Sequence, residues 1–191
     1  MCCGCRRRER MIAYLSGGER GGAGENAVVV LRDACGEDLP AIEILLSSEE
    51  GSWHVDDVGA AIVKRDHCVR VLVCKGELQG VLLASFIADE CSLLYALVHS
   101  QHRRRGLARQ FLQDLQQLAV LRSAETIFLE VRESNAAAIA LYRGEGFSLC
   151  GERGNYYPPV SCVRQGADIQ GASSVTASRR ETALLFSLSV V

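Results

Sequence analysis

The stretch at 93–109, LLYALVHSQHRRRGLAR, holds residues that suit the binding of an anion. A short apolar run breaks into a basic, glycine-containing turn and then resumes with helical spacing. A strand, loop and helix in this order leave backbone N–H groups unpaired at the helix start, where the helix dipole favours negative charge. Gly106 and Ala108 keep the backbone accessible, and three arginines at 103–105 add positive charge. The pattern predicts a phosphate-binding turn, although an arginine-rich helix start is also typical of a solvated turn.

A carboxylate in the strand-like run TIFLEV is a second chemical candidate. Strand alternation puts Ile127, Leu129 and Val131 on one face, and Phe128 and Glu130 on the other. Either the second face is a water-exposed sheet face, or the carboxylate is a general base at the inner end of a cleft. The pattern alone leaves both roles open.

A tyrosine follows twelve positions after this glutamate, at the end of a short helical pattern. Ser134 or Asn135 can cap that helix, and Gly144 and Gly146 end it. On helical spacing alone, Tyr142 is typical of a core aromatic side chain whose hydroxyl reaches water.

The first stretch and LEVRESNAAAIALYRGEGF at 129–147 together resemble the GNAT superfamily of acetyl-coenzyme A-dependent N-acetyltransferases. Within it they are most similar to the bacterial ribosomal-protein-alanine N-acetyltransferases (RimI-like), and GERGNYYP at 151–158 supports that likeness. The resemblance covers roughly residues 28–158, together with RRETALLFSL near the end. It implies the GNAT acyl-CoA N-acyltransferase fold, an α/β fold with a central twisted mixed β-sheet flanked by helices.

The resemblance also assigns site residues. It makes Glu130 the proton acceptor and Tyr142 the proton donor, and we expect both to face the gap that holds the reactive carbon. It implies acetyl-CoA as co-substrate and no metal, with Asn135 both capping its helix and contacting the cofactor. The implied cofactor-binding positions are Ala96, Leu97, Val98, Arg104, Arg105, Gly106, Leu107, Ala108, Arg109 and Asn135.

The implied reaction is transfer of the acetyl group to the free N-terminal α-amine of a protein by direct attack in a ternary complex. The implied substrate is the N-terminal alanine of a small-subunit ribosomal protein. Two alternatives stay open: acetylation of another amine (a lysine, a polyamine or an antibiotic), and a non-catalytic acetyl-CoA-binding sensor. The presence of both Glu130 and Tyr142 disfavours the sensor, since a mere binder needs neither proton-handling group.

Two regions are candidates for contact with the acceptor. The segment that follows the first predicted helix walls the acceptor pocket in this superfamily, so its acidic residues either attract a basic peptide or are plain solvated charges. These residues are Glu49, Glu50, Asp56 and Asp57. Tyr156 and Tyr157 either hold the substrate chain or close the last hairpin.

Composition excludes several classes of protein. The 191 residues, 48% of them hydrophobic, can bury one sizeable core, and no apolar run approaches the ~20 residues of a membrane helix. The net charge of the chain is −2. Because the first ten residues carry +3, the remaining residues carry −5, and this acidic part does not suggest nucleic-acid binding. We expect a monomer with a protein substrate and no direct nucleic-acid or membrane partner.

The nine cysteines fit a reducing cytoplasm, which is the expected location. Several lie in apolar strand-like runs, where a free thiol behaves as a small hydrophobic group. Cys2, Cys3 and Cys5 could supply part of the ligands of a metal site, but the sequence shows no second cysteine pair or histidine cluster to complete it. A tail or a misplaced start codon, with Met11 as the true start, explains these cysteines better.

Periodicity and turn residues predict the elements that position these candidates. Residues 1–26 are expected to be a flexible arm that need not be native, and 27–191 a single N-acetyltransferase domain with a long loop at 160–178. Strands are expected at 27–32, in a hairpin over 69–88 that turns at Lys75 and Gly76, and at 91–98, 126–131, 147–151 and 182–191. Helices are expected after Asp38, over about 104–121 and over about 135–144, and a short helix or helix-like loop is expected over 52–65.

Overall fold

The computed structural model describes residues 9–15, 26–48, 53–158 and 180–190, with side chains from residue 28 onwards. It divides into two compact units, Met1–Phe128 with Ser189–Val191, and Leu129–Leu188. Within the described residues, no helix has the length and apolar character needed to cross a membrane.

An antiparallel sheet with the strand order β1-β2-β3-β4-β5 forms the framework of the first unit. The strands are β1 Glu9–Leu15, β2 Asn26–Asp33, β3 His67–Cys74, β4 Glu77–Ile87 and β5 Glu90–Val98. The predicted hairpin is confirmed, and Lys75 and Gly76 have φ of +50° and +84°, as a tight turn between antiparallel strands requires. The expectation of a flexible arm is wrong for β1, which pairs with β2 along its whole length.

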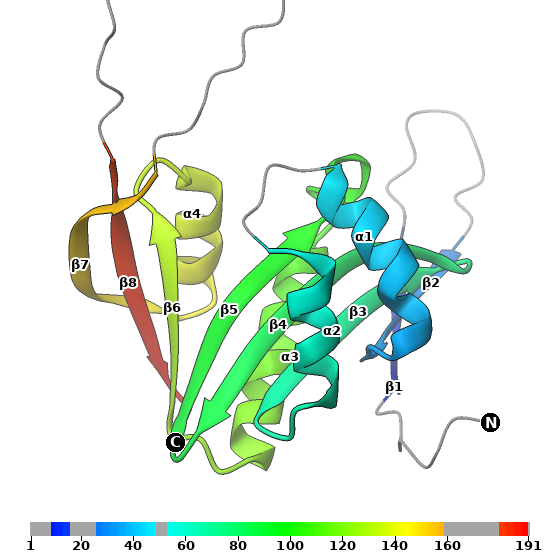
Figure 1. The fold of residues 1–191 in the computed structure, drawn as a ribbon, viewed down its shortest axis with the longest axis horizontal. Coiled ribbons are helices and arrows are strands. Elements are labelled where there is room, and N and C mark those ends of the chain that lie inside the picture. Colours follow the sequence, from blue (N-terminus) through cyan, green and yellow to red (C-terminus); the bar gives the residue numbers. More distant parts are fainter. Residues whose placement is uncertain (1–8, 16–25, 49–52, 159–179, 191) are drawn as a thin grey trace, which may run out of the picture. The chain divides into compact units, whose positions relative to one another are not determined.

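Helices cover both faces of this sheet. Figure 1 shows α1 Leu39–Ser47 and α2 Val55–Val63 on one face, and α3 Leu107–Leu121 on the other. The layer under α1 and α2 is built by Ile42, Leu45, Val58, Ala61, Val69, Val71, Val81 and Leu83. Burial on both faces explains why β3 and β4 are apolar nearly throughout rather than alternating.

A bulge in β5 turns part of that strand over. Leu83 of β4 lies opposite Tyr95, but its neighbour Ala84 lies opposite Leu93, so Leu94 is an extra residue without a partner on β4. Cross-strand partners share a face of a sheet, so Leu93 and Tyr95 lie on opposite faces although they are two positions apart. The residues after the bulge therefore present faces that simple alternation from the start of β5 does not predict.

A buried charge network ties α3 to the sheet. Arg70 of β3, only 2% exposed, donates from Nε and Nη2 to the two carboxylate oxygens of Asp114 on α3, at 2.8 and 3.2 Å. Its Nη1 donates to Asp33 at 2.7 Å. Sequence patterning gave no sign of this network, because one arginine in an apolar strand resembles an ordinary solvent-facing position.

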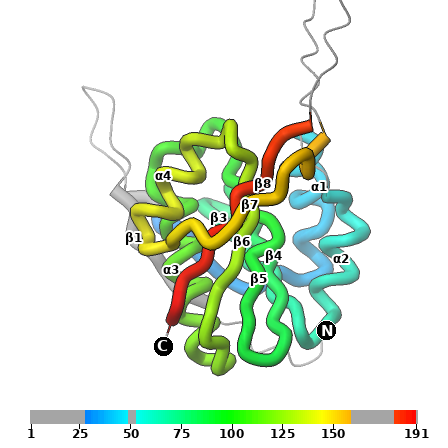
Figure 2. The backbone as a smooth tube through the Cα atoms, turned by 90° about the vertical axis from the view of Figure 1, so that its left-hand side faces the viewer, coloured from blue at the N-terminus to red at the C-terminus, as the bar shows by residue number. Residues whose placement is uncertain are grey.

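The second unit is a smaller sheet with one helix. Its elements are β6 Thr126–Arg132, whose first residues belong to the first unit, α4 Ala136–Gly144, β7 Ser148–Tyr157 and β8 Glu181–Ser189. The strand order is β6-β8-β7, and Figure 1 shows β8 between the other two strands, whereas Figure 2 views the same strands from the β7 side. β7 is longer than the predicted 147–151, and the loop predicted at 160–178 lies outside the described residues.

Two helix starts differ from the prediction. The Asp38 side chain does not cap α1; its carboxylate accepts hydrogen bonds from the Cys35 N–H at 2.8 Å and from Arg32 at 2.7 Å, which fixes the turn before the helix. The residue before α2 is His54, whose N–H donates to Asp57 at 3.4 Å, rather than Asp56. Glu49, Glu50 and the other predicted start, Ser52, lie outside the described residues.

Candidate functional site

The basic turn lies between β5 and α3; after a short 3₁₀ helix at Ser100–His102, its backbone is not helical again until Leu107. The prediction that α3 begins near Arg104 is wrong, because Arg104 and Gly106 have φ of +62° and +78°. Left-handed residues interrupt a right-handed helix. The first turn of α3 then begins beside this loop, and the N–H groups of a first helical turn point toward such a loop, an arrangement that binds anions in many proteins.

Gly106 suits this position for two reasons. A Cβ on a residue with φ of +78° is strained, and a Cβ placed there meets no protein atom within 4 Å. The space above the first turn of α3 is therefore open, and a ligand can approach the backbone there. The expected cradle fits the local geometry.

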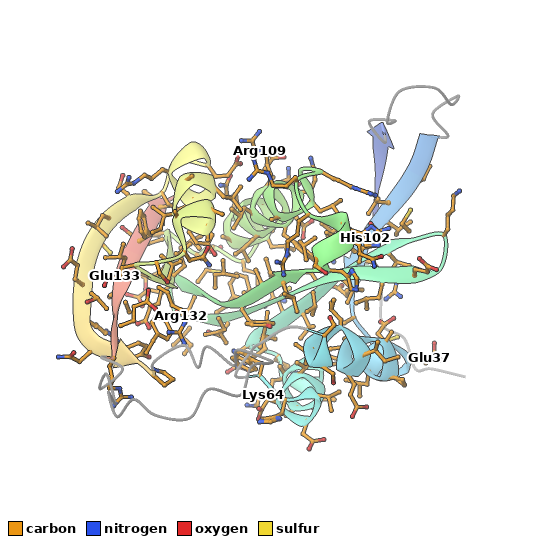
Figure 3. The ribbon with its side chains drawn as sticks, turned by 90° about the horizontal axis from the view of Figure 1, so that it is seen from above. Glu37, Lys64, His102, Arg109, Arg132 and Glu133 are labelled. Carbon is orange, nitrogen blue, oxygen red and sulfur yellow. The ribbon has the colours of Figure 1, made fainter. Side chains whose placement is uncertain are left out.

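The arginines of the turn have different roles. Arg103 folds back, and its Nε donates to the carbonyl of Val98 at 3.0 Å, which fixes the turn against the end of β5. Arg104, Arg105 and Arg109 are exposed, and Figure 3 shows Arg109 pointing outward from α3. Positive charge thus surrounds the first turn of α3.

His102 contributes less positive charge to this cluster than a free histidine would. Partial burial lowers the pKa of His102, and the neighbouring Arg105 cation lowers it further. Its Nδ1 lies 3.4 Å from Nη1 of Arg105, and its ring lies 5.6 Å from that of His99. These contacts explain both histidines as parts of the turn.

The three candidate positions on β5 lie on two faces. Ala96 and Val98 pair with Leu82 and Gly80, whereas Leu97 pairs with Val81 on the face covered by α1 and α2. Ala96 and Val98 therefore lie on the α3 face. Nine of the ten predicted cofactor-binding positions are consecutive or nearly so at this junction of β5 and α3, as the sequence implies.

In the second unit, Glu130 projects from the face of the sheet that lies away from α4. Leu129 and Val131 are buried on the opposite face while the Glu130 side chain is 29% exposed, so the predicted alternation is confirmed. Arg132, two residues further and therefore on the Glu130 face, lies on the side away from α4 in Figure 3. The Glu130 Oε1 lies 3.0 Å from Nη1 of Arg153 on β7.

Tyr142 lies on the other face. Its ring is 5.9 Å from that of Phe147, edge to face, and 6.4 Å from that of Phe186 on β8. The Glu133 N–H donates to the Thr182 carbonyl, and this antiparallel register places Phe186 on the α4 face. The aromatic role that helical spacing predicts for Tyr142 is thus present.

We expected the candidate acid and base to flank one gap and therefore to project from one face of the sheet. They project from opposite faces. Burial raises the pKa of Tyr142 to about 12, and the nearby Tyr157 contributes to the rise.

Tyr157 is a neighbour of both candidates. Burial raises its pKa, and the negative charge of Glu130 adds to the rise. The Arg132 guanidinium lies 4.4 Å from the Tyr157 ring centroid and donates to Glu181 at 3.2 Å and to the Pro158 carbonyl at 3.0 Å. The motif LEVR contains this arginine, but only the fold reveals that it joins the ends of β7 and β8.

Asn135 is the cap of α4. Its Oδ1 accepts from the Ala138 N–H at 3.1 Å, and the alternative cap, Ser134, instead donates its N–H to Glu181. The cap role predicted for Asn135 is confirmed. Within the described residues, no group of three His, Cys, Asp or Glu side chains is arranged to hold a metal ion. Cys2, Cys3 and Cys5 lie outside those residues.

Comparison with known proteins places these features in a family. The family model described as "Acetyltransferase (GNAT) family" matches residues 39–147, more than half of the chain. The [Ribosomal protein bS18]-alanine N-acetyltransferase of Escherichia coli (strain K12) is 39% identical over 87 residues, which are 46% of this chain and 59% of that protein. The N-acetyltransferase family 8 member 3 of Mus musculus is 30% identical over 115 residues, 57% of this chain and 50% of that protein. The chain thus matches only three fifths or less of the length of these relatives.

The fold is similar over a longer span. The crystal structure of the ribosomal-protein-S18-alanine N-acetyltransferase from Escherichia coli matches with a TM-score of 0.70 and 27% identity, over 85% of this chain and 94% of that chain. The mixed α/β fold expected from the sequence is therefore confirmed, and so is the resemblance that the motifs carry. The chain belongs to the Acetyltransferase (GNAT) family.

Proposed function

We propose that this protein transfers an acetyl group from acetyl-CoA to the free N-terminal amine of a protein, and that the acceptor is the N-terminal alanine of a small-subunit ribosomal protein. The observation that carries the proposal is the 39% identity to enzymes named for that reaction, over 87 residues. The open, positively charged first turn of α3 supports it, because an acyl-CoA carries phosphates.

The turn between β5 and α3 supplies what a diphosphate requires. The positive end of the helix dipole at the first turn favours an anion, and the exposed Arg104, Arg105 and Arg109 supply charge. Gly106 leaves the approach clear. Arg103, bonded to the Val98 carbonyl, holds the turn in register with the end of the strand. The thioester arm then follows Ala96 and Val98.

Glu130 serves as the base. The amine nitrogen attacks the thioester carbon, the C–N bond forms, and the nitrogen loses a proton to the carboxylate, directly or through one water. The C–S bond then breaks, and the sulfur leaves as a thiolate that takes up one proton. Glu130 and Tyr142 project from opposite faces of this sheet, so we expect the amine on the Glu130 side.

Tyr142 acts on the sulfur mainly through a hydrogen bond. Its phenol has a pKa of about 12, whereas a simple thiol has a pKa of about 8.5. Full transfer of the phenol proton to the thiolate is therefore uphill by roughly three powers of ten. The phenol stays protonated and stabilises the departing thiolate, which acquires its proton from solvent.

The acceptor is expected to lie on the Glu130 face, beside Tyr157 and Arg132. On that face, the ring of Tyr156 packs edge to face against Tyr157 at 5.1 Å and offers a surface for a peptide chain. The structure describes two of the acidic candidates, Asp56 and Asp57; both are exposed, and Asp57 accepts a hydrogen bond from the His54 N–H.

The test offers acetyl-CoA together with three acceptors in parallel: a peptide with a free N-terminal alanine, the same peptide with a blocked N-terminus and one lysine, and spermidine. Mass spectrometry should find one acetyl group on the first peptide and none on the others. Acetylation of the lysine or spermidine alone would overturn the proposed acceptor. Binding of acetyl-CoA without transfer to any acceptor would identify a sensor.

Glu130→Gln tests the base. The substitution keeps the shape of the side chain but removes the proton acceptor, so kcat should fall about 10²-fold or more, while the affinity for acetyl-CoA stays unchanged. Steady-state kinetics and calorimetric titration with coenzyme A measure the two quantities. A variant with wild-type kcat would remove Glu130 from this role.

A further inference from the structure

We propose that Arg153 is a positioning residue, which orients the Glu130 carboxylate for proton transfer by holding one of its two oxygens. This inference rests on the proposed function, because it concerns the group that we assign as base. The observation behind it is the ion pair between Arg153 Nη1 and Glu130 Oε1 at 3.0 Å.

The pair joins two strands that are not neighbours. β8 runs between β6 and β7, so the guanidinium spans two strand spacings of roughly 4.8 Å each. Arg153 lies directly opposite Ala183, whose short side chain is fully buried and leaves room above β8. Only a long side chain can reach Glu130 from this position, and lysine and arginine alone combine that length with positive charge.

The geometry uses one carboxylate oxygen and leaves the other for chemistry. Among the described residues, the ion pair engages Oε1, while no side chain is bonded to Oε2. A carboxylate held by one oxygen has a fixed plane, so its second oxygen has a defined direction in which to accept a proton. Such preorganisation raises kcat, because it removes the reorientation of the base from the reaction step.

A second contact holds the Arg153 side chain in place. Its guanidinium lies 5.6 Å from the centroid of the Tyr156 ring, a cation–π distance. The side chain is 53% exposed, so this ion pair by itself contributes little to the stability of the fold. A role in positioning the base explains the pair better than a role in holding the strands together.

The experiment is a double-mutant cycle on the full chain. Arg153→Ala should lower kcat roughly 10-fold with KM for acetyl-CoA and for the alanine peptide unchanged, and Arg153→Lys should recover part of the loss. In the Glu130→Gln background, Arg153→Ala should cause no further loss beyond about 2-fold, because the group that it orients is gone. Glu152→Gln, at the exposed neighbouring position on β7, is the matched control and should retain wild-type kcat.

Each other outcome has a distinct meaning. Equal losses from Arg153→Ala with and without Glu130 would overturn the proposal, since a structural effect on β7 adds independently. A raised KM for the peptide with unchanged kcat would also overturn it and make Arg153 a peptide-binding group. If Glu130→Gln alone had wild-type kcat, the proposed base would fail first, and the cycle would report that separately.

Discussion

At the scale of single residues, the tyrosine on α4 illustrates how environment defines a chemical role. A family motif assigns Tyr142 as a proton donor, but packing against Phe147 and Phe186 raises the pKa of its phenol to about 12. A group that holds its proton this firmly remains available as a hydrogen-bond donor at neutral pH but is a poor acid. Its contribution should therefore have the size of one hydrogen bond to a charged atom.

Tyr142→Phe tests that contribution. Loss of one hydrogen bond to a thiolate costs about 1.5–3 kcal/mol, which lowers kcat roughly 10- to 10²-fold. Because the pKa lies near 12, the phenol is protonated throughout the range from about pH 6 to pH 9, so the ratio of wild-type to variant kcat should be constant there. A ratio that changed tenfold per pH unit would show that Tyr142 ionises in this range and would contradict the assignment.

Gly106→Ala tests the phosphate cradle, with Gly76→Ala as its matched control. Both glycines have positive φ, +78° and +84°, and in both places a Cβ meets no protein atom within 4 Å. The backbone strain is thus equal, and each variant should lose about 1–2 kcal/mol of stability. Only Gly106→Ala should also weaken coenzyme A binding, by roughly tenfold or more in a calorimetric titration, because its methyl group occupies the ligand's approach. Equal affinities of the two variants for coenzyme A would mean that the phosphate-binding site lies elsewhere.

At the scale of elements, the sequence predicts the strands and helices that are marked by clear turn residues, capping residues or alternation. The Lys75-Gly76 turn, the Asn135 cap and the alternation in TIFLEV all depend on neighbours within a few residues, and all three are confirmed. Hydrophobic spacing predicts the start of α3 too early, because it does not reveal left-handed residues such as Arg104. The sequence does not reveal β1, because this short strand lies beside a glycine-rich segment and resembles part of that flexible segment.

The site shows the same division. Motifs point to Glu130, Tyr142 and the basic turn as candidates, but Arg153, the ion-pair partner of Glu130, lies on another strand and is set by sheet order. The bulge at Leu94 likewise decides which face Ala96 occupies, and a single sequence gives no register. Long-range pairing is therefore the part that residue patterns could not supply.

Gly80→Ala tests the contact between α3 and the strand that leads to the turn. A Cβ at Gly80 would lie 2.8 Å from the Leu97 carbonyl oxygen and 3.0 Å from the Phe111 ring, so α3 or β5 has to move. Overpacking of this kind costs roughly 1–3 kcal/mol, and thermal unfolding should occur about 2–10 °C lower. Gly36→Ala, where a Cβ meets nothing within 4 Å, is the control and should leave the unfolding temperature unchanged or slightly higher.

At the scale of the whole molecule, the question is whether the two compact units unfold together, as a single domain would. The family model spans 39–147 and thus crosses the division after Phe128, which favours one cooperative domain. Two buried cysteines of the first unit can report on it. Burial raises the pKa of Cys68 to about 11 and that of Cys91 to about 12, so in the folded protein these thiols lack both access and the reactive thiolate form.

Labelling of Cys68 and Cys91 by a thiol reagent should therefore require unfolding of the first unit, at a rate proportional to the unfolded fraction when refolding is fast. Phe186→Ala removes a fully buried ring from the second unit and costs about 3–5 kcal/mol. If the chain is one cooperative domain, this change accelerates labelling of both cysteines roughly 10²-fold or more, as Leu82→Ala in the first unit also does. Mass spectrometry of the labelled peptides measures both rates. Unchanged labelling in Phe186→Ala, with fast labelling in Leu82→Ala, would mean that the units unfold separately and that two domains share the family's motifs.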